Sequence, residues 1–169
     1  MSEIDLGLLL LRLGLATLLA GHAVQKSLGW LGGLGATKTA AVFESWGFRP
    51  GRALVLLAAV CELTGAFLVG SGLVFRLGCA ILIGTLIVAA APSAANGLWA
   101  QRGGCEVPAT YAGVAVCLAV TGPGGAALDR AIGLGDGGWP GAAAAIVVGV
   151  LAAVPPLLNR RRALRATAA

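Results

Sequence analysis

One acidic side chain stands in the middle of an apolar segment. Glu62 lies near the centre of the unbroken apolar run Ala53–Gly70, and no other charged residue occurs between Arg52 and Arg76. A charge at mid-bilayer costs roughly 2.5 to 3.5 kcal/mol on insertion scales, so such groups face a bundle interior. Two interpretations of Glu62 stay open. It binds a polar head group or relays a proton, or it forms a buried ion pair that only fixes the helix register.

The first apolar segment offers partners for this carboxylate. It contains four polar residues: Arg12, His22, Gln25 and Lys26. At 100° per residue, Arg12, His22 and Lys26 fall on one face of a helix. At about 1.5 Å per residue, Glu62 on an antiparallel second helix lies between Arg12 and His22 in height. The sequence therefore predicts a polar intramembrane pocket, formed by Arg12, His22, Lys26 and Glu62.

The composition requires a membrane environment for these residues. Of the 169 residues, 58% are hydrophobic and only 11% are charged, whereas a soluble domain has about 25% charged residues. About 20 apolar residues are needed for a helix to cross a bilayer. Five segments come near that length: Leu6–Val24, Ala53–Gly70, Leu73–Ala91, Val107–Thr121 and Pro140–Leu158.

These segments predict an all-α membrane protein, because an isolated apolar segment in lipid must satisfy its backbone hydrogen bonds internally. We expect a four-helix transmembrane bundle over residues 1–130. An added fifth transmembrane helix and a basic tail follow in residues 131–169. Glycines inside the segments predict close contacts between helices; they are Gly14, Gly21, Gly65, Gly78, Gly84, Gly113 and Gly149.

The formal net charge of +5 does not indicate a nucleic-acid partner, because the basic residues lie in loops and at the C-terminus. They concentrate in the first loop, the third loop and the segment after the last span, which five antiparallel helices bring to one side. The positive-inside rule places that side in the cytoplasm. We expect a multi-pass protein of a bacterial plasma membrane, with a short interfacial helix near Thr37–Phe48 in the first loop.

Motifs for metal or cofactor binding are absent from the sequence. Its four cysteines, Cys61, Cys79, Cys105 and Cys117, show neither a CxxC spacing nor a Cys/His pattern. The single histidine leaves no ligand set for a metal and no catalytic arrangement. We therefore assign no catalytic residue and expect no metal.

Several short motifs occur together in one order. They are HAVQK from His22, GFRPGRA leading into CELTGAFLVGSGLVFR, NGLW followed by GGCE, and GPGGAALD ending at Asp129. This ordered set resembles the DoxX family of integral membrane proteins over about Leu8–Asp129. The resemblance implies a four-helix membrane core, and many such proteins are described as subunits or relatives of oxidoreductases that deliver electrons to quinone.

The resemblance also singles out residues by their position. Arg12, His22, Lys26 and Glu62 match recurrent polar positions of the family, as do residues in the later motifs, and Gln25 belongs to the first motif. The further matched positions are Arg76, Asn96, Glu106 and Asp129. Three positions depart from the family pattern. Ala23 replaces a glycine, Ser93 replaces a frequent histidine, and Ala127 replaces a serine.

Three functions remain open. The first is an accessory subunit of a quinone-linked redox assembly, whose partner protein supplies the metal or flavin. The second is a non-catalytic scaffold that recruits a partner. The third is a path for a small solute or a proton, for which no inverted repeat is evident. A stand-alone enzyme is disfavoured, and a homo-oligomer is compatible with the sequence.

Overall fold

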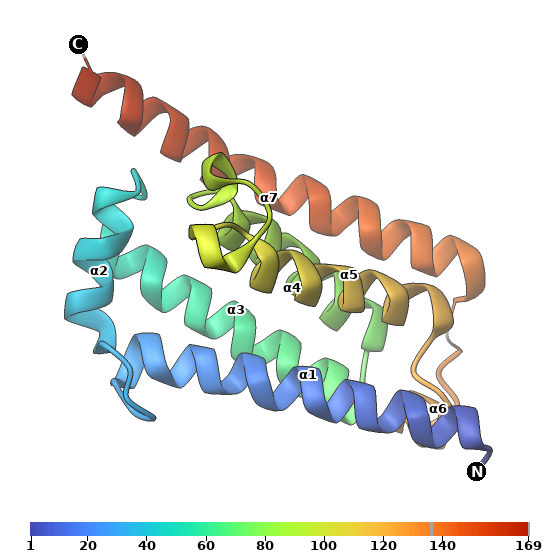
Figure 1. The fold of residues 1–169 in the computed structure, drawn as a ribbon. Helices are drawn as coiled ribbons and strands as arrows, with labels where there is room; N and C mark the ends of the chain where they lie inside the picture. The colour runs from blue at the N-terminus through green and yellow to red at the C-terminus, as the bar shows by residue number, and fades with distance from the viewer. Residues whose placement is uncertain (136, 169) are drawn as a thin grey trace.

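The computed structural model describes residues 1–135 and 137–168, and these residues form helices and loops without a β-strand. Five helices run side by side along one bundle axis (Figure 1): α1 (Glu3–Leu28), α3 (Gly51–Ser71), α4 (Phe75–Ala90), α5 (Glu106–Thr121) and α7 (Gly138–Ala168). Four short helices occupy the connections: α2 (Gly35–Ser45), η1 (Ala94–Asn96), η2 (Ala100–Arg102) and α6 (Leu128–Ala131). The predicted all-α membrane fold is confirmed.

The five long helices differ in length. Three of them, α1, α3 and α7, are long and apolar enough to cross a membrane. The other two, α4 and α5, have 16 residues each. A helix of that length spans about 24 Å, against about 30 Å for the hydrocarbon core. The predicted apolar helices are therefore all present, but α4 and α5 are shorter than the bilayer is thick.

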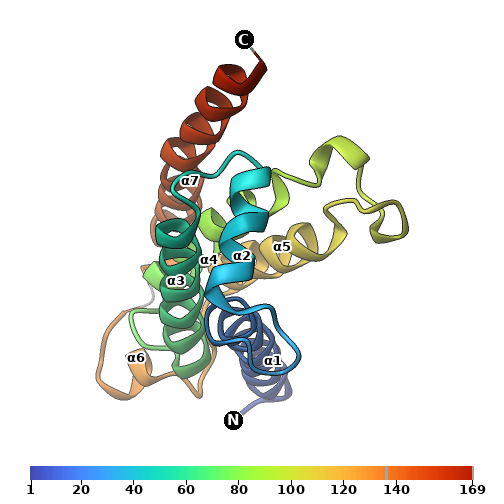
Figure 2. The same cartoon turned by 90° about the vertical axis from the view of Figure 1, so that its left-hand side faces the viewer.

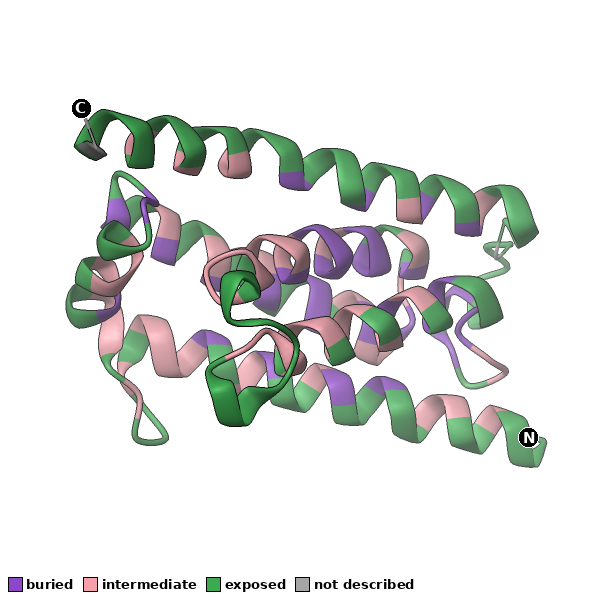
Figure 3. Cartoon of the chain, turned by 45° about the horizontal axis from the view of Figure 1, so that its top comes forward, coloured by how far each residue is buried: buried purple, intermediate pink, exposed green. Residues whose placement is uncertain are grey.

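Buried side chains gather on α4, which lies between the other long helices (Figure 3). Phe75, Cys79, Leu82 and Ile83 are each at most 2% exposed. The outer faces of α1 and α7 carry exposed large apolar side chains instead, such as Leu10 and Leu151. A helix with apolar residues on its outer face suits a lipid surrounding, because lipid tails are as apolar as these side chains.

The helix α2 lies across one end of the bundle (Figures 1 and 2). Its Glu44 side chain accepts a hydrogen bond of 3.0 Å from the amide of Gly51, which begins α3. A β-carbon on Gly51 would lie 2.4 Å from the carbonyl oxygen of Ala40, so the backbones of α2 and α3 touch only because residue 51 has no side chain. The short helix predicted in the first loop is confirmed; its position at a membrane interface stays a prediction.

The last helix extends beyond the span predicted for it. We expected a span over Pro140–Leu158 followed by a tail, but α7 continues through the arginines to Ala168. Alanine, leucine and arginine are strong helix formers, which explains this continuation. Arg160 donates a hydrogen bond of 2.9 Å from Nε to the carbonyl oxygen of Trp46, and its guanidinium lies 5.9 Å from the centre of the Phe48 ring. The end of α7 therefore holds the connection between α2 and α3.

Four of the glycines singled out from the sequence do permit close helix contacts. A β-carbon on Gly84 would lie 2.8 Å from the carbonyl oxygen of Gly149, and one on Gly149 would lie 2.8 Å from that of Ala80. Gly65 and Gly78 are similarly enclosed by side chains of the neighbouring helix. The expectation was wrong for Gly14 and Gly113, which have open space beside them, and for Gly21, which has only one contact, at 3.9 Å. Composition alone could not tell which helix face each glycine occupies.

The crossing of α4 and α7 predicts opposite effects for two otherwise similar substitutions. Gly84→Ala places a methyl group against the backbone of α7, and we expect it to lower the free energy of unfolding by about 1 to 3 kcal/mol. Gly113→Ala meets open space and should raise it by about 0.5 to 1 kcal/mol, because alanine favours a helix interior. Thermal unfolding in detergent, followed by circular dichroism, measures both. Equal effects of the two variants would contradict the close crossing.

Candidate functional site

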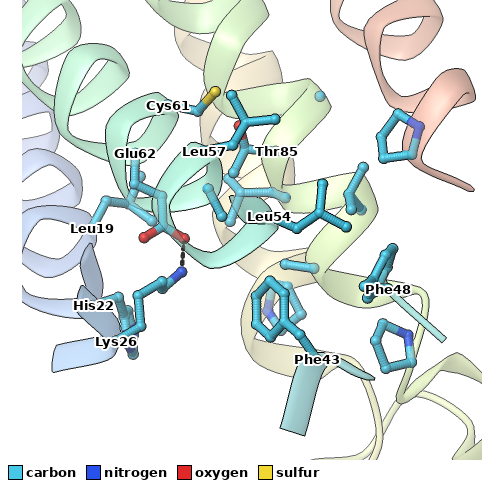
Figure 4. Close-up of a pocket in the computed structure, with 18 of the residues that line it drawn as sticks. Leu19, His22, Lys26, Phe43, Phe48, Leu54, Leu57, Cys61, Glu62 and Thr85 are labelled. Carbon is cyan, nitrogen blue, oxygen red and sulfur yellow. Dashed lines mark hydrogen bonds and ion pairs between the residues drawn. The ribbon is translucent and has the colours of Figure 1, made fainter. Parts of the chain in front are cut away.

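A cavity of about 590 Å³ lies within the bundle at the end covered by α2. All five long helices and α2 contribute to its wall, and most of the lining side chains are apolar (Figure 4). The aromatic side chains of Phe43, Trp46 and Phe48 come from α2 and the segment after it. Small-molecule sites are typically cavities of about 300 to 1,000 Å³ with mostly apolar walls and a few polar groups. The cavity is the candidate site of this protein.

An ion pair forms the main polar feature of the cavity wall. Lys26 Nζ lies 2.5 Å from Glu62 Oε1 (Figure 4). Glu62 is 3% exposed, and its second oxygen, Oε2, has no hydrogen-bond partner within the described residues. A buried carboxylate needs a paired charge or a hydrogen bond, and Lys26 supplies both to Glu62 Oε1 within the bundle.

His22 reaches the same cavity from α1, one helical turn before Lys26. Its ring centre lies 6.2 Å from that of Tyr111 on α5, at a tilt of 50°. The two rings therefore bring α1 and α5 together at the cavity. The structure thus groups three of the four residues expected in the polar pocket, namely His22, Lys26 and Glu62.

Arg12 lies elsewhere, which corrects the expected four-residue pocket. A β-carbon on Gly70 would be 3.0 Å from Ala16, and one on Gly72 would be 2.2 Å from Arg12 Nη1. Gly72 therefore marks the level of Arg12, and Glu62 precedes it by ten residues, or about 15 Å along the helix. The estimate from the sequence assumed that α1 and α3 end at equal heights. The end of α3 instead packs beside the third and fourth turns of α1, at Arg12 and Ala16.

Arg12 is fully buried beside the segment that precedes α6, and α6 lies at the opposite end of the bundle from α2 (Figure 1). Its Nη2 donates a hydrogen bond of 3.1 Å to the carbonyl oxygen of Ala126, and its guanidinium lies 6.0 Å from the centre of the Phe75 ring. No carboxylate within the described residues lies at ion-pair distance from it. Arg12 therefore joins α1 to the loop after α5 and to the start of α4, rather than contributing to the cavity.

Asp129 completes this second polar cluster. Its carboxylate accepts hydrogen bonds from the amides of Val74 at 2.7 Å and Phe75 at 2.9 Å, and Asp129 is 6% exposed. These amides begin α4 and have no partner within the helix, so Asp129 acts as a cap supplied from a distant segment. From α1, Asp5 accepts a bond of 2.5 Å from the amide of Gly125. The loop of residues 122–127 and Asp129 are thus tied to both α1 and α4.

The family model described as DoxX matches residues 7–95, which is more than half of the chain. The chain belongs to the DoxX family. The match covers α1 to α4 and ends within η1, so α5 and α7 lie outside it. No curated protein and no solved structure matches the chain. The added α7 nevertheless packs along α4 and lines the cavity. The division of the chain at residue 130 stays a prediction.

The departures from the DoxX pattern can now be placed. Ser93, which replaces a frequent histidine, lines the cavity. A histidine there would have stood on the same wall as the ion pair, so this chain lacks one proton-carrying group at the site. Ala127 precedes α6 in an extended conformation without a side-chain cap, where a serine would satisfy a helix amide. Ala23, which replaces a glycine, is fully buried and lies between His22 and Lys26 in the sequence.

The remaining positions that match the DoxX motifs lie outside the cavity wall. Gln25 donates to the carbonyl oxygen of Leu31 at 3.2 Å, and Asn96 donates to that of Gly103 at 3.1 Å. Glu106 accepts from the amide of Ala100 at 2.8 Å. These bonds stabilise loops at the cavity end of the bundle. Arg76 lies in the first turn of α4, near Asp129 in the opposite cluster.

Sequence reasoning missed several residues of the site. Tyr111 on α5 and Pro156 on α7 line the cavity, and so do the first-loop aromatics that were interpreted only as an interfacial helix. No spacing rule would have brought α5 or α7 to Glu62, because their contact depends on tertiary packing. Asp5 had a local signal, since Ser2 and Asp5 form the capping box of α1. The described part of the chain contains no group of three or more His, Cys, Asp or Glu side chains that could hold a metal.

The Asp129 cap predicts a large loss of stability on its removal. Asp129→Ala leaves two amides at the start of α4 without their acceptor, of which that of Phe75 is buried. We expect the free energy of unfolding to fall by about 2 to 4 kcal/mol. Glu106→Ala is the matched control, because it removes a single exposed bond and should cost less than about 1 kcal/mol. Denaturant unfolding in detergent measures both. A loss for Asp129→Ala as small as that of the control would show that the cap is dispensable.

Proposed function

We propose that this DoxX protein is the membrane subunit of a redox assembly and binds a quinone in the cavity beside Lys26 and Glu62. The observation that supports this is the combination of an apolar cavity of about 590 Å³ with one buried ion pair on its wall. An isoprenoid quinone likewise combines a polar part with an apolar part: its ring carries two carbonyl groups, and its tail is apolar. The apolar walls suit the tail and the ion pair suits the ring.

The polar groups of the cavity fit the chemistry of such a ring. The ammonium group of Lys26 has three donors and gives one to Glu62, so it has donors left for a carbonyl oxygen of the ring. Reduction of a quinone to a hydroquinone consumes two electrons and two protons. In this proposal the electrons come from a metal or flavin of a partner protein, and Lys26, Glu62 and His22 exchange protons with water at the α2 end.

A scaffold function is the second candidate, and the ion pair also supports it. Lys26 and Glu62 join α1 to α3, so the pair could serve only to fix their register. The two functions differ in one testable respect. If the ion pair only orders the bundle, apolar residues of similar volume can replace it with little loss of stability, and the affinity for quinone should not change. If the ion pair belongs to a ligand site, the same replacement should weaken quinone binding.

We also propose a bacterial plasma membrane as the location, with the α2 end of the bundle in the cytoplasm. The alternation of the long helices brings the first loop, the third loop and the C-terminus to that end. It carries Lys38, Arg49, Arg52 and Arg102 together with the four arginines that follow Asn159. This excess of basic residues supports a cytoplasmic orientation under the positive-inside rule.

Quinone binding can be measured through Trp46, which lines the cavity. A benzoquinone with a decyl tail should quench tryptophan fluorescence of the purified protein in nanodiscs, and Trp46→Phe should remove most of the quenching. We expect the double substitution Lys26→Met with Glu62→Met to keep the fold and to weaken binding about tenfold or more. Lys38→Met removes an exposed lysine of α2 and should bind as the unmodified protein does.

Unchanged affinity in the double variant, with its thermal stability retained, would favour the scaffold over the quinone subunit. Absence of saturable quenching in the unmodified protein would reject the quinone site itself. Glu62→Gln alone separates charge from shape, because it keeps the side-chain volume and leaves Lys26 without its counter-charge. We expect it to lower both affinity and stability.

The orientation predicts which side of the membrane can label Cys105. Cys105 lies in the third loop and is partly exposed. A variant that retains only this cysteine should react with a membrane-impermeant maleimide in inverted vesicles and not in intact cells. The same background with Ala131→Cys, in α6 at the other end of the bundle, should show the reverse. Labelling of Cys105 in intact cells would place the α2 end outside.

A further inference from the structure

Basic side chains gather at the end of the bundle that α2 covers, where α7 also ends (Figure 1). Besides the buried Lys26–Glu62 pair, eight basic residues lie there against two acidic ones, Glu44 and Glu106. The eight are Lys38, Arg49, Arg52, Arg102, Arg160, Arg161, Arg162 and Arg165. None of them forms an ion pair within the described residues. The protein itself therefore leaves the positive charge of this end largely unbalanced.

The arginines of α7 lie at the depth of the lipid head groups. Trp139 stands near the start of α7 and is 76% exposed, as suits a tryptophan at a membrane interface. Twenty residues, about 30 Å of helix, carry the chain from Trp139 across the hydrocarbon core to Asn159. The arginines begin at the next residue, and α7 remains helical through them. Since the head-group layer is roughly 5 to 8 Å thick on each side, these arginines fall in or beside it.

Contacts with the connection between α2 and α3 hold this part of α7 in place. A β-carbon on Gly47 would lie 2.8 Å from Leu164 Cγ and 3.2 Å from the carbonyl oxygen of Arg160. Arg160 Nε donates to the carbonyl oxygen of Trp46, while its Nη1 and Nη2 have no hydrogen-bond partner within the described residues and are not buried. The end of α7 is thus a docked helix with unused guanidinium donors, and not a loose tail.

Helix stability does not explain these arginines. Arg161 and Arg165 are both exposed and lie four residues apart, so they share one face of α7. Like charges at this spacing destabilise a helix. The dipole at the C-terminal end of α7 favours a positive charge at Arg165, but Arg52 lies in the first turn of α3, where the dipole disfavours one. An anion at this surface would offset these repulsions, because it supplies the negative charge that the fold lacks.

The guanidinium group and its depth identify the kind of anion. Its planar N–H groups match phosphate oxygens in pairs, and the phosphate groups at this depth belong to lipids. Choline cancels the phosphate charge in phosphatidylcholine, whereas phosphatidylglycerol keeps it. We propose that the end of α7, docked on the α2–α3 connection, is a binding surface for an anionic phospholipid, with Arg161 and Arg165 as its main contacts. This surface does not depend on the quinone site, so either proposal can fail alone.

The position of this surface gives the lipid a second role, which is to brace the cavity. Pro156 lines the cavity one helical turn before Arg160, and Phe48 lines it with its ring centre 5.9 Å from the Arg160 guanidinium. A lipid that holds the end of α7 therefore also holds two parts of the cavity wall. One of them, α7, lies outside the family match.

Trp46 reports on the surface, because its carbonyl oxygen is bonded to Arg160 and it is 42% exposed. A protein with Trp30→Phe, Trp99→Phe and Trp139→Phe retains this tryptophan alone. In nanodiscs, phosphatidylglycerol with brominated chains competes with unlabelled phosphatidylcholine, and the reverse pairing corrects for random contacts. We expect the quenching of Trp46 to show about a tenfold preference for the anionic lipid.

Two double variants of this protein remove equal charge from the same end of the bundle. Arg161→Gln with Arg165→Gln should reduce the preference to about twofold or less, and glutamine keeps α7 helical. The matched control, Lys38→Gln with Arg102→Gln, should leave the preference nearly unchanged. Arg161→Lys with Arg165→Lys keeps the charge and should retain an intermediate preference, because lysine lacks the planar pair of donors.

Absence of a lipid preference in the protein with all its arginines would overturn the proposed surface. Equal losses in the two glutamine variants would overturn it as well, since a diffuse positive field would then attract the lipid. Displacement of the brominated lipid by millimolar glycerol 3-phosphate would show that the arginines bind a free phosphate instead of a lipid.

Discussion

The pairing of Glu62 with Lys26 is the constraint on which the arrangement of the bundle depends. A carboxylate in the middle of an apolar helix needs a counter-charge at the same depth, and the register of α1 against α3 places Lys26 there. That register brings His22 beside the pair and sets Ala16 against Gly70. It also explains why α1 extends past the level of α3 at its N-terminal end. The electrostatic requirement of one residue thus fixes the relative position of two helices.

The bundle has two polar ends with different properties. At one end, Arg12 Nη2, Asp5 and Asp129 bond to backbone groups of the loop after α5 and of α4. Arg12 Nε and Nη1 are buried there without a hydrogen-bond partner within the described residues. At the other end, His22, Lys26 and Glu62 line an apolar cavity, and the Lys26–Glu62 ion pair is the main polar contact there. A polar cluster that binds backbone is suited to holding helices together. One that borders an open apolar volume is suited to holding a ligand.

The sequence predicted the elements of the fold well and their relative depths poorly. Each apolar segment became a helix, because hydropathy and backbone hydrogen bonding in lipid leave no alternative. The helix ends lie within a few residues of the predicted ones, except that α7 continues past Leu158 to Ala168. The partner of Glu62 was harder to choose. Arg12 and Lys26 lie on one face of α1, and no feature of the sequence states how far α3 slides along that face. The glycines show the same limit, since Gly84 and Gly113 look alike in sequence and differ in what they contact.

The hydrogen-bonding character of the cavity shows why a list of polar residues is a poor guide to a membrane site. Thr85 and Ser93 each donate their hydroxyl hydrogen to a carbonyl of the preceding turn, as hydroxyl groups in apolar helices do when no water is available. Pro156 has no amide hydrogen to donate to the carbonyl oxygen of Ala152, so α7 lacks that helical hydrogen bond. In a bilayer, where every unpaired carbonyl is costly, such a gap persists only where packing compensates for it. The close crossing of α4 and α7 at Gly84 and Gly149 supplies packing beside it.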